Sequence, residues 1–442
     1  MKTLICLLIF WLSFLGCSDG ENTRDADQHL VRILWQRFEE VENQSQYSEV
    51  LSAAAWEAHR KDLVFLSPLI PENYPEPYLP HGLLSDARID PSLGKSPLIN
   101  EDLVELGKKL FFDERLAYSE RTSSFGGMSC STCHREELAF TDRRSLGVGI
   151  DGAATHRNAP TLLNAAYNST LTWANPVFPL LEMQAKIPLF GNDPVEMGLR
   201  GKELDILHKL GEDREYRELI KKAYGLEYPS DLLSGRIDYS LITFALAAFE
   251  RSLIRFDTRF DRFLQNDLGP GEALTRSELR GLKLFYGIEP LSSGTSLACS
   301  SCHSGLMLTD SFHYVREGTY YNNKEFHNTG IYNTNGQGAY PSPNHGYATA
   351  TQLAANPRLM GQFRTPPLRF VGLTAPYGHD GSFTDLDSIL KHYAAGGRAS
   401  LGAFGQNPYV DEKVRNGFAI EQDEAAALID FLMTLQTTSF SL

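Results

Sequence analysis

Two Cys-x-x-Cys-His motifs carry the clearest chemistry in the sequence. They consist of Cys130, Cys133 and His134 in the first copy and of Cys299, Cys302 and His303 in the second. Two thiols at this spacing can lie on one face of a helical turn and add to the two vinyl groups of one haem, and the adjacent histidine then reaches the iron. A redox dithiol or half of a zinc site would explain one motif better than two. The motifs therefore predict two covalently bound haem c groups, with His134 and His303 as iron ligands.

Related sequence blocks precede the two motifs and predict two domains of one type. Residues 106–112 and residues 280–286 both have helical spacing, with an apolar face that can point at a haem. A glycine–proline cluster at residues 269–271 marks the boundary between the blocks. We therefore expect a first haem domain at residues 96–268, which reacts with peroxide if its iron is open, and a second at residues 269–442.

The fold is predicted to be mainly α. Residues 239–265 predict one long helix between the haem domains, and shorter helices are predicted at residues 28–40, 47–60, 387–393 and 422–435. No segment shows the sustained alternation of a strand. We expect two cytochrome c-like haem domains with long loops, joined by the long helix and preceded by an N-terminal helical extension and proline-rich connector at residues 17–95.

The N-terminus has the pattern of a bacterial export signal. Lys2 precedes an apolar stretch at residues 4–14, which is shorter than the ~20 residues of a membrane-spanning helix. Leu15, Gly16 and Cys17 then resemble a lipoprotein cleavage site, although an ordinary signal with an incidental cysteine is the alternative. We expect residues 1–16 to be a signal peptide, and the mature chain to lie in the periplasm with a lipid on Cys17 as its membrane anchor.

The charge balance excludes one class of partner. The 442 residues contain 41 basic and 55 acidic side chains, for a formal net charge of −14. Because nucleic-acid binding needs clustered Lys and Arg side chains, nucleic acid is not an expected partner.

Stretches outside the haem motifs resemble the bacterial di-haem cytochrome c peroxidases and the MauG-type enzymes. They are residues 157–164 and 374–381, together with Trp173, Gln184 and Glu196. Residues 171–176, 190–198 and 326–330 are most similar to the methanobactin-associated (MbnH-type) members of that group. The likeness covers about residues 96–440 and implies an enzyme that reacts with hydrogen peroxide at one of its haems.

The resemblance implies roles for individual residues. Peroxide would react at the haem of His134, with Glu196 as the distal acid/base and Gln184 beside it, and Trp173 matches the tryptophan between the two haems. From the residues alone, Glu196 would be a helix-start acid or a surface charge. A lone tryptophan is more often part of a core than a relay.

The resemblance also implies a calcium ion between the haem domains. Asn158 and the backbone carbonyls of Thr374 and Pro376 match its ligands. Oxygen ligands of this kind suit calcium, and waters would complete the coordination shell.

Two positions depart from the typical peroxidases. Where those enzymes carry a histidine that caps the first haem, this chain has Ile150, so the resemblance implies an open first iron as in the MauG branch. We interpret the nearby His156 as a loop histidine. Where they carry a methionine ligand to the second iron, this chain has Tyr393, the MauG-type ligand, whose phenolate stabilises high oxidation states. The alternatives for that ligand are Met307, Met360 and His392.

The resemblance implies that peroxide drives oxidation of a protein substrate, through high-valent iron shared between the two haems. The closer likeness implies tryptophan on a copper-binding partner. The alternatives are a cytochrome c peroxidase, with electrons from a small cytochrome or cupredoxin, and a non-catalytic electron-transfer cytochrome. The remaining histidines are interpreted as structural or surface groups, namely His313, His327 and His345, while His379 is expected to support the second haem pocket.

Overall fold

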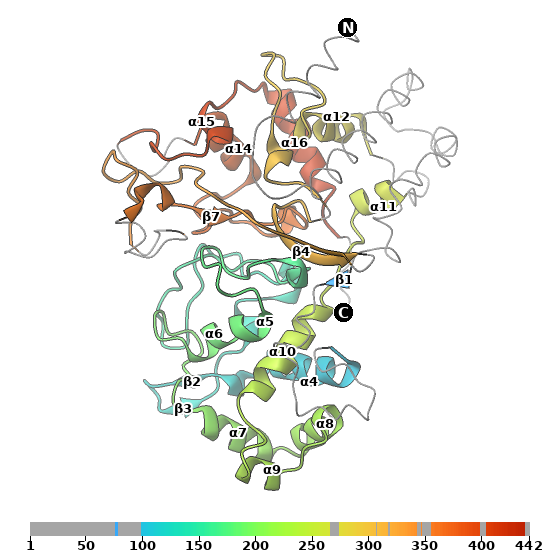
Figure 1. The fold of residues 1–442 in the computed structure, drawn as a ribbon, viewed down its shortest axis with the longest axis vertical. Helices are drawn as coiled ribbons and strands as arrows, with labels where there is room; N and C mark the ends of the chain where they lie inside the picture. The colour runs from blue at the N-terminus through green and yellow to red at the C-terminus, as the bar shows by residue number, and fades with distance from the viewer. Residues whose placement is uncertain are drawn as a thin grey trace. The chain divides into compact units, whose positions relative to one another are not determined.

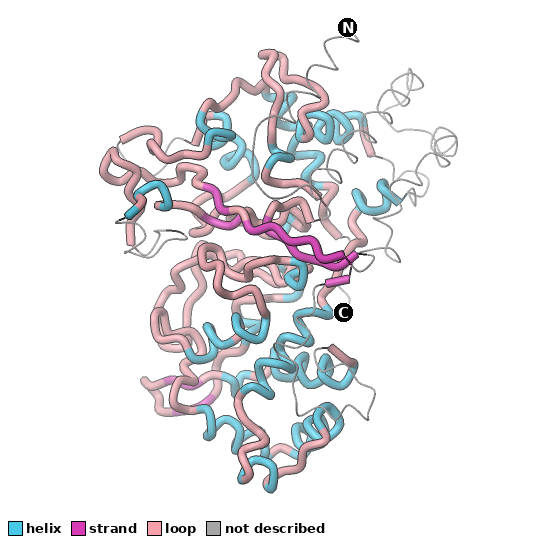
Figure 2. The backbone as a smooth tube through the Cα atoms, in the orientation of Figure 1, coloured by secondary structure: helices cyan, strands magenta, loops and turns pink. Residues whose placement is uncertain are grey.

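Helices and long loops make up most of the described chain (Figures 1 and 2). The computed structural model describes residues 76–77, 99–265, 274–305, 307–316, 319–342, 346, 355–397 and 404–437. The predicted signal peptide, Cys17, His345 and the two helices predicted before residue 61 lie outside those residues. The described residues belong to one compact unit. Within them, no helix is both long enough and apolar enough to cross a membrane.

Two helix pairs with the same close crossing explain the repeated sequence blocks. Helix α4 (Glu101–Phe111) packs on α10 (Ser240–Ser252), and α12 (Arg276–Phe285) packs on α16 (Gln422–Met433). A Cβ atom on Gly107 of α4 would lie 1.9 Å from the carbonyl oxygen of Ala245. In the same way, a Cβ atom on Gly281 of α12 would lie 1.9 Å from the carbonyl oxygen of Ala427. Each block therefore needs its glycine so that the two helices can touch.

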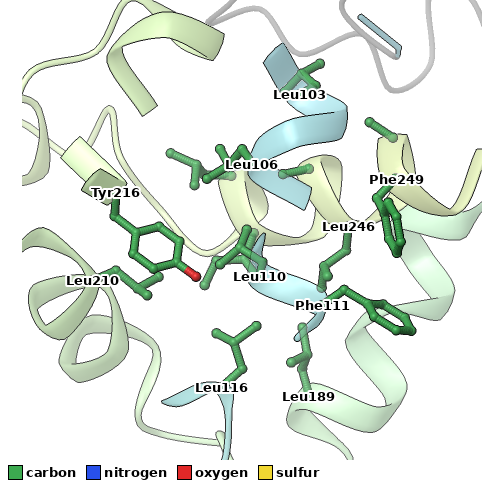
Figure 3. Close-up of a cluster of buried hydrophobic side chains, with 14 of the residues drawn as sticks. Leu103, Leu106, Leu110, Phe111, Leu116, Leu189, Leu210, Tyr216, Leu246 and Phe249 are labelled. Atoms are coloured by element: carbon green, nitrogen blue, oxygen red, sulfur yellow. The ribbon is translucent and has the colours of Figure 1, made fainter. Parts of the chain in front are cut away.

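The apolar face of α4 is the centre of the largest hydrophobic core. Leu103, Leu106 and Leu110 follow the helical repeat and are fully buried. Figure 3 shows them among side chains from several other elements, including Phe249 of α10. Replacing one such leucine by alanine is expected to cost about 2–5 kcal/mol of stability, because the cavity left behind collapses only in part.

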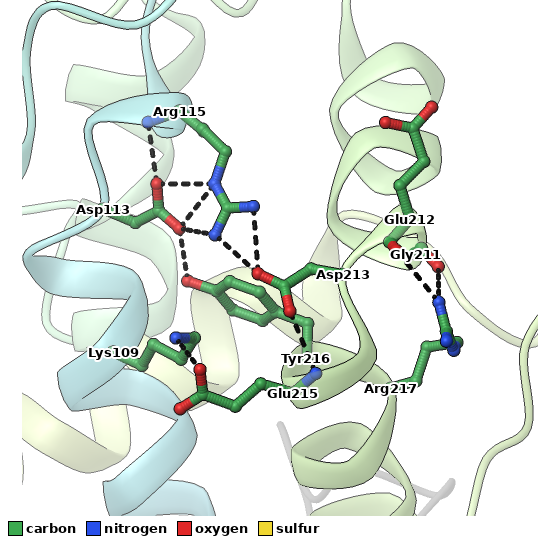
Figure 4. Close-up of polar contacts among 9 residues, drawn as sticks. All are labelled: Lys109, Asp113, Arg115, Gly211, Glu212, Asp213, Glu215, Tyr216 and Arg217. Carbon is green, nitrogen blue, oxygen red and sulfur yellow. Dashed lines mark hydrogen bonds and ion pairs between the residues drawn. The ribbon is translucent and has the colours of Figure 1, made fainter.

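A polar cluster ties the end of α4 to the start of α8 (Arg214–Tyr224). Asp113 accepts hydrogen bonds from Arg115 and from the hydroxyl of Tyr216, and Arg115 also contacts Asp213 at 3.2 Å (Figure 4). Asp213 is in turn the N-cap of α8, where its carboxylate accepts from the backbone N–H of Glu215. These contacts fix the start of α8 against the end of α4.

The remaining regular elements are short. The helices are α5 (Leu181–Gln184), α6 (Lys186–Phe190), α7 (Glu203–Glu212), α8 (Arg214–Tyr224), α9 (Ser230–Leu233), α11 (Arg259–Gln265), α14 (Leu386–Ala394) and α15 (Glu412–Arg415). Helices α14 and α16 confirm the predictions at residues 387–393 and 422–435 to within one or two residues at their ends.

The single long helix predicted for residues 239–265 is wrong. Helix α10 ends at Ser252 and α11 begins at Arg259. Between them, the side chain of Asn164 donates to the carbonyl of Arg255 and accepts from its N–H, and the Asn164 N–H donates to the carbonyl of Leu253. These tertiary hydrogen bonds replace those that a continuous helix would have made, so the apolar periodicity runs across a break.

The structure also contains strands where none was predicted. Strands β4 (Ser311–Arg316) and β5 (Thr319–Lys324) pair antiparallel, and the two-residue β1 (Glu76–Pro77) pairs with the other edge of β4. Two smaller antiparallel pairs join β2 (Tyr118–Ser119) to β3 (Ser124–Phe125) and β6 (Phe326–His327) to β7 (Phe363–Arg364). Aromatic residues on both faces hid the alternation of β4 and β5, and stacking of Tyr314 on Tyr321 supports the pair.

Candidate haem sites

The first cysteine–histidine motif forms a tight turn that prepares its histidine for a metal. Cys130–Thr132 is a 3-10 turn, and Nδ1 of His134 lies 2.9 Å from the carbonyl oxygen of Phe140. Because a carbonyl only accepts, Nδ1 carries the proton and Nε2 is left with its lone pair. Burial lowers the pKa of His134, which keeps the ring in the neutral form that binds iron.

The second motif repeats this arrangement. Cys299–Ser301 is again a 3-10 turn, and Nδ1 of His303 lies 3.1 Å from the carbonyl oxygen of Leu308. Burial lowers the pKa of His303 as well. Both histidines therefore have the tautomer and the protonation state expected of an iron ligand, and the chain reaches that state twice by the same local fold.

A cavity of about 310 Å³ adjoins the second motif. Cys299, Cys302 and His303 line it, together with mostly apolar side chains. Several buried polar side chains also line it, among them Arg364 and His379. Arg364 is 2% exposed, and no described group forms a hydrogen bond with Nε2 of His379. An apolar pocket with two thiols, a neutral histidine and buried donors fits a haem and its acidic groups.

Tyr393 also lines this cavity, from the last turn of α14. Burial raises the pKa of its phenol, so an anionic oxygen there needs a cation such as iron beside it. Among the described residues, Met307 packs with another cluster and Met360 is absent from the cavity wall. Nε2 of His392 lies 2.8 Å from the carbonyl oxygen of Thr329, so this nitrogen is engaged in a hydrogen bond with the backbone.

Trp173 lies at the wall of the same cavity and is held at both ends. Its indole Nε1 donates to the carbonyl of Asn158 at 2.8 Å, and its own carbonyl accepts from the N–H of Arg364 at 2.8 Å. The N–H of Asn158 donates to the carbonyl of His379 at 2.9 Å. Trp173 is therefore buried and fixed where a segment of the first predicted domain meets the second.

The three predicted calcium ligands line one cavity wall. Asn158, Thr374 and Pro376 all contribute to it, although Asn158 is more than 200 residues from the other two in sequence. The amide nitrogen of Asn158 donates to the carbonyl of Arg144 at 2.8 Å, which assigns its other side-chain atom as the acceptor oxygen. A carboxamide oxygen and backbone carbonyls are a donor set that fits calcium.

Glu196 lies near the first motif and next to Ile150. The backbone carbonyl of Glu196 accepts a hydrogen bond from the N–H of Ile150 at 2.8 Å. The two segments also touch at the residues before these, since a Cβ atom on Gly149 would lie 2.0 Å from the carbonyl oxygen of Val195. The carboxylate is close enough to influence the pKa values of Cys130 and Cys133. Burial raises the pKa of Glu196 itself. The predicted acid and the predicted open position are thus adjacent on two hydrogen-bonded segments.

Gln184 lies at the end of a short helix that precedes the Glu196 segment in the chain. It is the last residue of α5 and is half-buried, and α6 follows directly. The carbonyl of Pro188 in α6 accepts from the N–H of Met197, which joins α6 to the Glu196 segment. The backbone therefore joins the segment of Gln184 to that of Glu196 through α6.

Sequence reasoning missed an ionic cluster beside the second motif. His327 lies between two carboxylates, with Nε2 at 2.7 Å from Asp310 and Nδ1 at 2.7 Å from Asp411. Its Nε2 is also 3.7 Å from the sulfur of Cys302. His327 was predicted to be structural or at the surface, and its buried ion pairs give it a specific structural role. The sequence signal was its place in the MbnH-like stretch at residues 326–330.

A second buried charged group lies near the first motif. Glu182 and Arg251 form an ion pair of 2.5 Å, with side chains 2% and 4% exposed. Burial raises the pKa of the neighbouring Glu250 to about 8, against the stabilising charge of Arg251. Glu250 also influences the pKa of Cys130. Adjacent charged residues near the end of an apolar helix were the sequence signal for this cluster.

The chain is similar to known di-haem proteins over most of its length. A family model described as di-haem cytochrome c peroxidase matches residues 101–269. The methylamine utilization protein MauG of Methylorubrum extorquens is 31% identical, over 77% of this chain and 80% of that protein. The cytochrome c551 peroxidase of Pseudomonas aeruginosa is 31% identical, over 69% of this chain and 74% of that protein. The crystal structure of a MauG-like protein associated with microbial copper homeostasis is 34% identical, with a TM-score of 0.69, over 84% of this chain and 95% of that chain.

Proposed function

Because the chain belongs to the family of di-haem cytochrome c peroxidases and MauG proteins, which are oxidoreductases with two haem c groups, we propose that it uses hydrogen peroxide to oxidise a protein substrate. When bound, the haems supply peroxide reduction at the first iron and storage of oxidising equivalents at both. The observation that carries the proposal is Tyr393 in the wall of the second haem cavity. A phenolate ligand favours oxidised iron, whereas the methionine of an electron-accepting haem favours the reduced state.

In the first domain, the side chains of this chain would manage protons. His134 would hold the first iron, and Ile150, which stands where typical peroxidases carry a capping histidine, would leave that iron open to peroxide. The Glu196 carboxylate would take the proton from the near oxygen of peroxide and return it to the far oxygen. Its burial supports this role, since a raised pKa keeps a carboxyl group available as an acid as well as a base. Gln184 would orient the bound peroxide.

In the second domain, the chain would hold and connect the other haem. His303 and Tyr393 would be its iron ligands, and Trp173 would lie on the route between the haems. The two hydrogen bonds of Trp173 support that role because they fix the indole between segments of both domains. We place the domain boundary at residues 268 and 269. A calcium ion on Asn158, Thr374 and Pro376 would lock the segments together.

The proposed substrate is tryptophan on a copper-binding partner. The support is the 34% identity to the MauG-like protein associated with microbial copper homeostasis. A lipid on Cys17 would hold the enzyme at a membrane in the periplasm. The second candidate is reduction of peroxide with electrons from a small cytochrome or cupredoxin, which the relatives named as peroxidases favour.

A resting-state measurement tests the iron sites. Low-temperature EPR of the ferric protein is expected to show one high-spin and one low-spin haem, and Y393F should change the low-spin signal. Two low-spin haems would contradict direct peroxide attack and favour an electron-transfer cytochrome.

A second measurement tests the substrate. A co-expressed copper-binding partner should gain mass on addition of peroxide. Turnover with a reduced small cytochrome, without any mass change in the partner, would favour the peroxidase instead.

A further inference from the structure

Tyr332 lies between the second haem cavity and a second, polar cavity. Its ring centroid is 6.1 Å from that of His379, which lines the haem cavity. Tyr332 itself lines the polar cavity of about 390 Å³, together with His156 and Asp380. One layer of side chains therefore separates the place of a haem from a hollow that a donor molecule can enter.

Aromatic rings continue from Tyr332 towards Trp173. The rings of Tyr332 and Tyr340 are 5.3 Å apart, and those of Tyr340 and Phe363 are 6.2 Å apart. Trp173, Tyr340 and Phe363 belong to one buried cluster. Phe363 stacks on His379 with centroids 3.7 Å apart. An electron can cross such short separations between rings, so Tyr332 is electronically close to the proposed relay.

The hydroxyl of Tyr332 has the partner that tyrosine oxidation requires. Loss of an electron makes a phenol strongly acidic, so the electron leaves readily only if a base takes the proton. Tyr332 donates its hydroxyl hydrogen to the carboxylate of Asp380. Tyr340, by contrast, donates to the side-chain oxygen of Asn328 at 2.9 Å, and an amide is no base. Of these two neighbouring tyrosines, Tyr332 alone pairs with a proton acceptor.

The charges around the pair are compatible with this chemistry. Asp380 also accepts from the N–H of Ser382 at 3.1 Å. Arg157, His379 and Tyr340 are the other titratable groups in electrostatic contact with it, and the Arg157 guanidinium supplies the compensating positive charge. The carboxylate can therefore take the phenolic proton through its existing hydrogen bond from Tyr332.

We propose that Tyr332 is a redox-active tyrosine through which a phenol or indole group in the polar cavity gives electrons to the enzyme. The inference rests on the proposed use of peroxide. In each passage Tyr332 loses one electron to the oxidising equivalent that peroxide delivers, and its phenolic proton moves to Asp380. The donor then returns an electron to the tyrosyl radical, and the proton returns from Asp380. Two passages supply the two electrons with which one hydrogen peroxide and two protons from solvent become two waters.

The size and lining of the polar cavity set the class of donor. Its wall includes Ser145, Thr155, His156 and Ser382, which offer hydrogen bonds to the hydroxyl of a phenol or the N–H of an indole. A volume of about 390 Å³ admits one such side chain. A protein that presents a single exposed tyrosine or tryptophan fits this description.

The test uses the full protein with both haems bound. Samples mixed with hydrogen peroxide and frozen at successive times are analysed by EPR, and the optical spectrum of the haems is followed in parallel. The wild type is expected to form a tyrosyl signal, which Y332F loses and the matched variant Y340F retains. D380N is expected to slow the appearance of the signal, since an amide cannot take the proton. N-acetyltyrosinamide, the probe donor, should quench the wild-type signal.

The outcomes separate the inference from the function on which it rests. If the haem spectra of the wild type do not change on addition of peroxide, the proposed function is overturned, and this inference with it. Haem spectra that respond normally, with no tyrosyl signal in the wild type or with an undiminished signal in Y332F, overturn the inference alone. Equal haem absorbance and melting temperature in Y332F and Y340F exclude misfolding as the cause of a lost signal.

Discussion

The indole nitrogen of Trp173 donates a hydrogen bond to the backbone carbonyl of Asn158, at 2.8 Å. The proposed relay between the haems is thus joined directly to a proposed calcium ligand. A change in the position of Asn158 at the proposed calcium site should therefore alter the hydrogen bond of Trp173. Trp173 is buried, so water cannot readily replace Asn158 as its hydrogen-bond partner.

The first prediction concerns this connection. W173F keeps an aromatic ring but loses the N–H donor, and it should cost about 1 kcal/mol of stability. After one equivalent of hydrogen peroxide, we expect only the first haem to change its EPR signal in W173F, whereas both change in the wild type. Removal of calcium with EGTA should weaken the response of the second haem in the same way, and calcium but not magnesium should restore it. A second haem that responds fully in W173F would rule out the relay.

The second prediction concerns Glu196. E196Q keeps the shape of the side chain but cannot accept or return a proton, so the reaction with peroxide should slow by about 10²–10⁴-fold. Stopped-flow absorbance of the haems measures this rate. The matched control is E218Q, which changes an exposed glutamate that pairs with Arg214. Equal rates in the two variants would contradict a catalytic role for Glu196.

The third prediction concerns the cluster of Asp310, His327 and Asp411. H327Q leaves two carboxylates facing each other, and it should cost about 3 kcal/mol of stability, as for other broken buried ion pairs. The exposed His208 offers a control, and H208Q should melt like the wild type. Equal melting temperatures of H327Q and H208Q would show that the cluster does not stabilise the fold.

The same cluster should give a defined pH dependence. The two carboxylates raise the pKa of His327 to about 12 against the effect of burial, and the hydrogen bond from His327 lowers that of Asp411 to about 2. The His327 contribution is complete below the unfolded pKa of about 6.5 and fades as pH rises towards 12. The Asp411 contribution is complete above about pH 4 and is lost as pH falls through 2. The wild type minus H327Q difference in melting temperature should therefore be largest between about pH 4 and 6.5.

The fourth prediction concerns Glu250. Burial raises its pKa to about 8 in the folded chain, so folding favours the protonated form. Its contribution to stability is complete below the unfolded pKa of about 4.3 and is lost as pH rises through 8. E250Q should remove this loss, which amounts to roughly 5 kcal/mol between about pH 4.3 and 8, at about 1.4 kcal/mol for each tenfold change in proton affinity. Thermal melting from pH 5 to 9 measures it, with the exposed E212Q as control. A profile of E250Q as steep as that of the wild type would contradict the assignment.

The sequence by itself determined the parts of this protein that are local along the chain. Cys130, Cys133 and His134 act together because covalent haem attachment needs a fixed short spacing, and the second motif repeats it. Helices α14 and α16 were predictable for the same reason, since an apolar face recurs every three or four residues. The positions of Tyr393 and Glu196 came from likeness to a family, and their places in the structure follow from packing.

Only the tertiary structure decided what depends on residues far apart in sequence. The break between α10 and α11 comes from Asn164, about ninety residues earlier, whose amide competes for the backbone of the intervening segment. The pairing of Tyr332 with Asp380 and the ionic cluster around His327 likewise join loops whose spacing carries no periodic signal. Such contacts are fixed by which loops the core brings together. A hydrogen bond requires two atoms about 3 Å apart in space, but the residues that carry them can be separated by any number of positions in the sequence.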